Sequence, residues 1–97
     1  MKKLVVLYTM SSCPFCSEMK DMLNEENIEY YERDIDVHKK EYDDFVKLTE
    51  NDYLPSFSII TIDENNEVNN FEYLVPDESF NSLDEAVEKI KEKVIKG

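Results

Sequence analysis

The first third of the chain places the tightest limit on the fold. Leu4–Tyr8 is a short apolar run rich in β-branched residues, typical of a central strand covered on both faces. Residues 14–27 then carry apolar side chains at helical spacing, and residues 29–35 form a second, less apolar strand suited to a sheet edge. A helix that crosses between two such strands predicts a βαβ unit with a parallel pair.

The rest of the chain predicts two more helices and a hairpin. A helix is expected over residues 38–50, followed by strands over 57–62 and 68–74 that are close enough to pair as an antiparallel hairpin. Ser82 with Glu85 three residues later is a capping-box pattern that announces a last helix. The order β-α-β-α-β-β-α describes an α/β fold, a four-stranded mixed sheet flanked by three helices.

Length and charge narrow the range of partners. A chain of 97 residues builds one hydrophobic core, so we expect a single domain over residues 1–97, as a monomer. Its 23 acidic against 11 basic residues give a net charge of −12, which repels a phosphate backbone and argues against nucleic acid. An excess of acidic residues usually means only a well-solvated surface. The more specific alternative is that this surface binds a basic protein partner.

The N-terminal residues do not match a signal peptide, and this bears on the expected cellular compartment. Lys2 and Lys3 before the apolar Leu4–Leu7 mimic a signal peptide, but that run is shorter than the roughly 7 to 15 residues required. No run approaches the roughly 20 apolar residues of a membrane span. We therefore expect no membrane partner and a cytoplasmic setting, or the host cytoplasm if the chain is viral.

The sequence Cys13-Pro14-Phe15-Cys16 stands where the first strand ends and a helix begins. A helix N-terminus presents unpaired N–H groups and about half a positive charge, which favours a thiolate at Cys13. Pro14 suits the first helical turn because its missing N–H costs no intrahelical bond. Cys16 lies one turn deeper, close enough to attack a mixed disulfide on Cys13. The arrangement predicts an exposed nucleophile and a shielded resolving thiol.

A cysteine pair at this spacing can also arise without redox turnover, in three ways. A structural zinc site needs two further ligands, and His38 is the only histidine, so we expect no metal. An inert disulfide would close a very short loop and stabilise little. Two buried cysteines could also occur here by chance. The strand, Cys-x-x-Cys and helix inside a βαβ unit favour redox chemistry.

Tyr8-Thr9 followed by Cys13-Pro14-Phe15-Cys16 resembles the active site of the dithiol glutaredoxins. The resemblance implies a thioredoxin/glutaredoxin fold, in which Cys13 is the nucleophile, Cys16 is the resolving thiol, and the two form a disulfide. Leu54-Pro55 resembles the Val-Pro step of the family, which implies a cis Pro55 that faces the cysteines. The substrate-binding residues that the resemblance implies are Tyr8, Pro14, Phe15, Leu54 and Pro55.

Two regions depart from the family pattern, and both concern glutathione. Met10 stands where glutaredoxins usually have Lys or Arg, three residues before the first Cys. Tyr73–Ser79 replaces the usual Gly-Gly and following acidic residues, and the only glycine is Gly97. The hairpin region is longer and more like that of a thioredoxin, but Leu7 fills the position of the buried acid of thioredoxins. We expect no tightly bound cofactor, with glutathione kept as a candidate reductant that binds poorly.

Four further residues invite a functional interpretation. Met10 and Tyr53 are candidates for the rim of a substrate groove, whereas Met19 falls on the apolar helix stripe and is expected in the core. His38 at a helix start is expected to be a surface or capping residue, because thiol exchange needs no catalytic base.

Two functions remain open at this stage. The first is a thiol-disulfide oxidoreductase that reduces protein disulfides or glutathione mixed disulfides, with glutathione or a thioredoxin-type reductase as electron donor. The alternative is a thioredoxin-fold binding module or an iron-sulfur cluster carrier without dithiol turnover.

Overall fold

In the computed structural model, which describes residues 2–94, the elements follow one another in the predicted order β-α-β-α-β-β-α. They are β1 (Lys2–Thr9), α1 (Pro14–Glu25), β2 (Tyr31–Asp34), α2 (Lys39–Thr49), β3 (Ser56–Ile62), β4 (Val68–Leu74) and α3 (Leu83–Val94).

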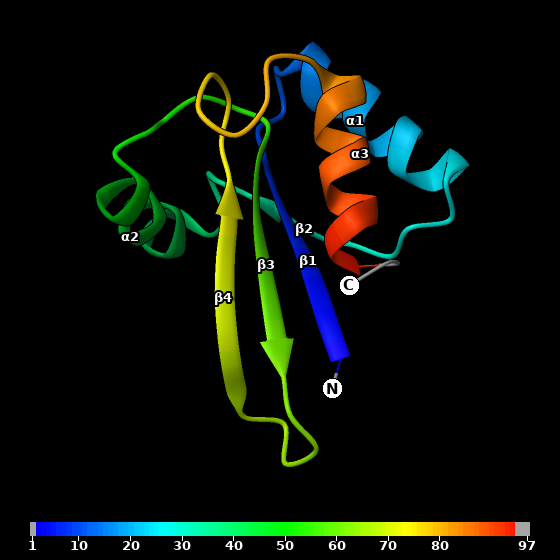
Figure 1. Ribbon diagram of the computed structural model, residues 1–97. Coiled ribbons are helices and arrows are strands. Elements are labelled where there is room, and N and C mark those ends of the chain that lie inside the picture. The colour runs from blue at the N-terminus through cyan, green and yellow to red at the C-terminus, as the bar shows by residue number, and fades with distance from the viewer. Residues whose placement is uncertain (1, 95–97) are drawn as a thin grey trace.

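The four strands form one mixed sheet in the order β2-β1-β3-β4. β1 pairs in parallel with β2 and antiparallel with β3, and β3 pairs antiparallel with β4. The predicted parallel pair and hairpin are both confirmed, as is the edge position of β2. Figure 1 shows α2 on one side of this sheet and α1 and α3 on the other.

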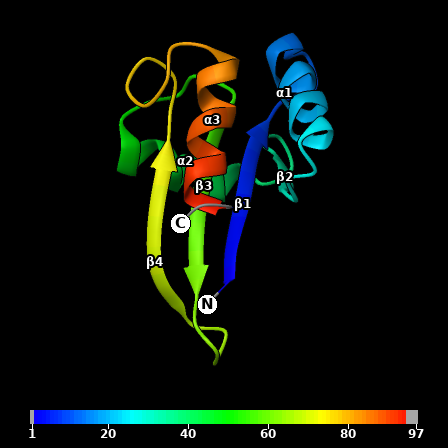
Figure 2. The ribbon, with the colours of Figure 1, turned by 45° about the vertical axis from the view of Figure 1, so that its right-hand side comes forward.

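The apolar run in β1 is continuous because the strand is buried on both faces. Val5 and Leu7 belong to the cluster under α1 and α3, whereas Val6 and Tyr8 belong to the cluster under α2. Since side chains alternate across a strand, a strand covered twice needs apolar residues at every position. Figure 2 shows α1 beside the carboxyl end of this strand. The βαβ unit therefore brings the start of α1 to one end of the sheet.

Two hydrophobic clusters make up the core. The larger one, between the sheet and the α1/α3 pair, contains Val5, Leu7, Met19, Leu23, Ile28, Phe57, Ile59, Leu74, Phe80, Ala86, Val87 and Ile90. The smaller one, under α2, contains Val6, Tyr8, Tyr42, Phe45 and Val75. Met19 lies in the core, as its place on the helix stripe predicts.

The helices are short and amphipathic, with 12, 11 and 12 residues. α3 begins with the predicted capping box: the N–H of Glu85 donates to Ser82 Oγ, and the N–H of Asn81 donates to the Glu85 carboxylate. Within residues 2–94, no helix is long and apolar enough to cross a membrane.

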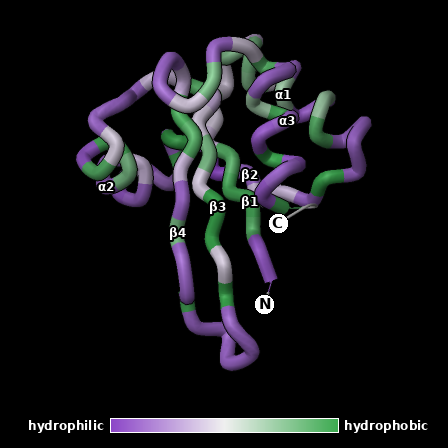
Figure 3. The backbone as a smooth tube through the Cα atoms, in the orientation of Figure 1, coloured by the Kyte–Doolittle hydropathy of each residue, from purple (hydrophilic) through white to green (hydrophobic). Residues whose placement is uncertain are grey.

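The hairpin of β3 and β4 extends past the helices, and its far end is hydrophilic (Figure 3). In the predicted turn, the Asp63 carboxylate accepts hydrogen bonds from the N–H groups of Asn65 and Glu67. Residues 64–70 at this end are exposed, so they need no apolar partners.

The second strand is shorter than the predicted range of residues 29–35. Asn27 has a φ of 57°, which ends α1, and the N–H of Ile28 then donates to the Leu23 carbonyl. Ile28 turns into the core, so the chain joins the ladder only at Tyr31. A tertiary contact thus overrides the local strand pattern over the first two residues.

Candidate active site

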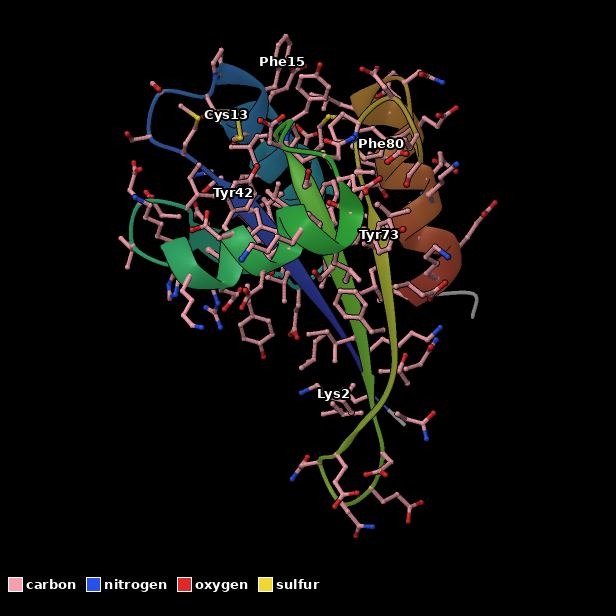
Figure 4. All side chains as sticks on the ribbon, turned by 90° about the vertical axis from the view of Figure 1, so that its left-hand side faces the viewer. Lys2, Cys13, Phe15, Tyr42, Tyr73 and Phe80 are labelled. Carbon is pink, nitrogen blue, oxygen red and sulfur yellow. A yellow bond between two sulfur atoms is a disulfide. The ribbon has the colours of Figure 1, made fainter. Side chains whose placement is uncertain are left out.

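Cys13 and Cys16 are joined in a disulfide, with their Cα atoms 5.2 Å apart. The pair lies between the end of β1 and the first turn of α1, so the site is described in its oxidised form. Figure 4 shows Cys13, Phe15 and Phe80 at the end of the molecule away from Lys2.

The two sulfurs occupy unequal environments. Cys13 is the N-cap residue of α1 and half-buried, and its Sγ accepts a hydrogen bond of 3.1 Å from the backbone N–H of Cys16. Cys16 is only 1% exposed. Pro14 fills the first helical position between them, as expected. A helix N–H that donates to the outer sulfur favours a thiolate at Cys13 in the reduced protein, and the greater exposure of Cys13 makes it the sulfur that a reactant from solvent can reach.

The peptide bond between Leu54 and Pro55 is cis, as the family resemblance implies. The loop around it is held by Asn51, a residue that the sequence analysis did not single out. Its side-chain amide donates to the Pro76 carbonyl over 2.9 Å and accepts from the N–H of Tyr53 over 2.9 Å. Asn51 is therefore a positioning residue that ties the cis-proline loop to the segment after β4.

A groove of about 450 Å³ borders the site. It is formed by residues of α1, the cis-proline loop and the segment that leads from β4 into α3. The residues that line it are Phe15, Glu18, Met22, Leu54, Pro55, Pro76, Asp77, Phe80, Asn81, Ser82, Leu83 and Asp84. Three of the predicted substrate-binding residues are thus brought together, namely Phe15, Leu54 and Pro55.

Tyr8 is not part of this groove, and the prediction that it contacts substrate needs correction. Its side chain is 4% exposed, and its ring centroid lies 4.6 Å from that of Phe45 and 5.7 Å from that of Tyr42. Because even-numbered residues of β1 face α2, the ring is on the opposite side of the sheet from α1. Burial raises the pKa of Tyr8 to about 12, so the phenol keeps its proton at neutral pH.

Three other candidates are exposed but do not line the groove. Pro14 is exposed on the first turn of α1, Met10 is 38% exposed, and Tyr53 is 59% exposed. His38 is the N-cap residue of α2 and its side chain makes no capping bond. In the described part of the chain, residues 2–94, no three His, Cys, Asp or Glu side chains are grouped as a metal ion would need.

The segment after β4, which the sequence marked as a departure from the family pattern, contributes Pro76 and Asp77 to the groove. Asp77 has a φ of 67°, and its N–H donates to the Phe80 carbonyl over 2.9 Å. The Ser79 hydroxyl accepts from the N–H of Val75 over 3.1 Å. Asp77 adopts this left-handed conformation although it has a Cβ, because Asp tolerates it better than most residues.

A polar network supports α1 on the other side of the site. The buried Thr9 hydroxyl donates to Glu32 over 2.7 Å, and Lys20 Nζ contacts the same carboxylate over 3.1 Å. The hydrogen bond from Thr9 and, less strongly, Lys20 lower the pKa of Glu32. Lys20 lies one turn after Cys16, so this network ties the cysteine-bearing helix to β2.

Comparison with known proteins agrees with this geometry. The glutaredoxin family profile matches residues 5–59, more than half of the chain, including both cysteines and Pro55. A thioredoxin from Plasmodium falciparum, known from a crystal structure, superposes with a TM-score of 0.58 and 19% identity over 95% of this chain and 70% of that chain. This likeness shows the thioredoxin-type fold. No curated protein matches the sequence. The profile match, the fold and the Cys-x-x-Cys pair together show that this chain belongs to the glutaredoxin family of thiol-disulfide oxidoreductases.

Proposed function

We propose that this protein reduces disulfides of protein substrates, or glutathione mixed disulfides, by a dithiol mechanism. The Cys13 thiolate attacks one sulfur of the substrate disulfide, forms a mixed disulfide and releases the other sulfur as a thiolate that takes a proton from water. Cys16, deprotonated, then attacks Sγ of Cys13 and releases the second substrate thiol. Two electrons pass to the substrate, and the Cys13–Cys16 disulfide forms.

The observation that carries the proposal is the contrast between the two cysteines. Cys13 caps α1 with a sulfur that already accepts an N–H, while Cys16 is 1% exposed behind it. A nucleophile must be accessible and a resolving thiol must be protected from other reactants. This division supports dithiol turnover over a binding module or a cluster carrier.

The roles are tested by replacing each cysteine in turn. Cys13→Ser should abolish disulfide reduction, whereas Cys16→Ser should accumulate a mixed disulfide between Cys13 and substrate, detected by mass spectrometry. In the reduced protein at neutral pH, iodoacetamide should label Cys13 before Cys16. Faster labelling of Cys16, or a trapped adduct on Cys16 in Cys13→Ser, would reverse the assignment.

The electron donor returns two electrons to the Cys13–Cys16 disulfide, either from two glutathione molecules that become one glutathione disulfide or from a thioredoxin-type reductase. We propose that glutathione is the weaker donor. It carries two carboxylates and one ammonium, and a chain of net charge −12 repels it. Met10 also leaves the usual basic position without a cation. A reducing compartment such as the cytoplasm would supply either donor.

Turnover at varied glutathione concentration tests this choice. We expect Met10→Lys to lower the half-saturating glutathione concentration about tenfold, because one charge-assisted hydrogen bond contributes on the order of 1.5 to 3 kcal/mol. Met10→Gln is the neutral control. Saturation of the unmodified protein at low glutathione, with no gain from the lysine, would contradict the proposal.

A further inference from the structure

The groove beside the disulfide has a charge that suits one class of substrate. We propose that it selects protein segments with a Lys or Arg side chain close to the target disulfide, an inference that rests on the proposed function and specifies its substrate.

Within the described part of the chain, the groove lining carries carboxylates and no basic residue. Glu18 on α1, Asp77 after β4 and Asp84 on α3 all line it and are all exposed. Among residues 2–94, none of the three is paired with a Lys or Arg. Because they come from three separate segments, their charges face the same volume only in the folded chain. A positively charged side chain of the substrate would complement these carboxylates.

Two lysines on the helices that contribute to the groove, Lys20 of α1 and Lys89 of α3, are engaged elsewhere. Lys89 Nζ donates to the Ser79 carbonyl, and Lys20 Nζ contacts Glu32 over 3.1 Å. Neither lysine lines the groove. The carboxylates at the groove therefore keep their full attraction for an incoming charge.

The walls of the groove are apolar, which suits the long stems of Lys and Arg. Met22, Leu54 and Phe80 contribute to these walls, and Phe15 beside them is 60% exposed. A basic side chain can lay its methylenes on such a surface while its head reaches a carboxylate. The exposed aromatic ring next to the cysteines also offers a face to a guanidinium or ammonium group.

The helix N-terminus at the groove does not reverse this preference. The capping box of α3 occupies the N–H groups of Asn81 and Glu85, and Asp84 already lies in the first turn. A helix end is equivalent to about half a positive charge, against three carboxylates. An anionic ligand such as glutathione is thus disfavoured where a cationic segment is attracted.

The test uses peptides with one internal disulfide that differ only in two flanking residues, Lys-Lys, Gln-Gln or Glu-Glu. Reduced protein is mixed with each peptide, and the second-order rate of peptide reduction is measured in a single turnover, which needs no electron donor. At low salt we expect the Lys-Lys peptide to react about tenfold faster than the Glu-Glu peptide, and the ratio to shrink as salt screens the charges.

Matched variants separate the groove from the overall charge. The groove variant E18Q/D77N/D84N should lower the Lys-Lys to Glu-Glu ratio about fivefold. The control D43N/D44N/E64Q removes three other exposed carboxylates, from α2 and the hairpin turn, and should change the ratio less than about twofold. Asp77→Asn alone, which tolerates the same φ, should produce part of the loss.

Two outcomes overturn the inference: equal rates for the Lys-Lys and Glu-Glu peptides in the unmodified protein, or an equal loss of preference in the groove and control variants. Failure of the unmodified protein to reduce any of the three peptides would instead contradict the proposed function itself. The Gln-Gln peptide distinguishes these cases, because its reduction requires the cysteines and no charge attraction.

Discussion

The unequal chemistry of two identical side chains arises from one turn of helix. Cys13 caps α1 and accepts a backbone N–H, whereas Cys16, three residues later, is turned into the protein. The same helix leads to Lys20, which joins Thr9 and Glu32 on the neighbouring strands. At the scale of single residues, the helix that carries both cysteines is thus held in place by a hydrogen bond and an ion pair to the Glu32 carboxylate.

Glu32 should make stability depend on pH in a defined direction. Its pKa is lowered in the folded chain, chiefly by the Thr9 hydroxyl, so its contribution is present above the unfolded-state value of about 4.3 and is lost as pH falls through the folded value. Glu32→Gln should therefore lower the free energy of unfolding at pH 7 by about 0.2 to 1 kcal/mol, and by less at pH 3.

Urea unfolding at both pH values measures this difference. Glu64→Gln in the exposed hairpin turn is the control, since it removes the same charge from a position outside the ion pairs of residues 2–94. An equal effect of Glu32→Gln at pH 7 and pH 3 would show that the carboxylate is not stabilised by folding.

At the scale of elements, the groove depends on loops that are fastened to one another. Asn51 links the cis-proline loop to the Pro76 carbonyl, and the capping box fixes the start of α3. Both devices act on the segments that line the groove, so both can be tested for stability and for rate.

Asn51→Ala should lower the free energy of unfolding by about 1 to 3 kcal/mol, because it leaves the partly buried N–H of Tyr53 and carbonyl of Pro76 without their partner. It should also slow single-turnover reduction of a peptide disulfide in the fully folded fraction. Asn51→Asp is the comparison: it keeps an acceptor for the Tyr53 N–H but puts a carboxylate oxygen in place of the donor to the Pro76 carbonyl. A rate unchanged in both variants would show that the link does not position the groove.

Ser82→Ala should cost about 1 kcal/mol of stability, because the hydroxyl that accepts the Glu85 N–H is lost at the start of α3. Thermal or urea unfolding measures the loss. Ser17→Ala in the exposed part of α1 is the comparison, and should be neutral or slightly stabilising since alanine favours helix. Equal effects of the two substitutions would contradict the role of the cap.

At the scale of the whole molecule, the net charge of −12 acts against the compact state. The radius of gyration is 12.8 Å, so charges across the entire fold repel one another at 0.01 M salt, where the screening length is about 30 Å. Raising NaCl to 0.15 M, with a screening length of about 8 Å, should raise the Tm by a few degrees.

Calorimetry in the two salt concentrations tests this expectation. The gain should shrink near pH 4, where Asp and Glu are about half protonated. A Tm that falls with added salt at pH 7 would mean that attractive ion pairs outweigh the self-repulsion.

Much of this protein follows from the sequence by itself. The apolar run of β1, the helical period after Cys13 and the capping box at Ser82 each report a local preference that the fold satisfies. The order of elements and the place of both cysteines were also predictable, because a strand and the helix that follows it are adjacent in the chain. The cis state of Pro55 followed from family resemblance and not from any local pattern.

Only the tertiary structure decided which residues share the groove. Glu18 is far in sequence from Asp77 and Asp84, and none of the three carries a local signal of a common site, because exposed carboxylates occur throughout this acidic chain. Tyr8, next to the active-site turn in sequence, faces the opposite side of the sheet because side chains alternate across a strand that is buried twice. The sequence determines which segments become helices and strands, because those preferences are local. Which side chains from distant segments share one surface is decided only when the sheet and the helices pack around a common core.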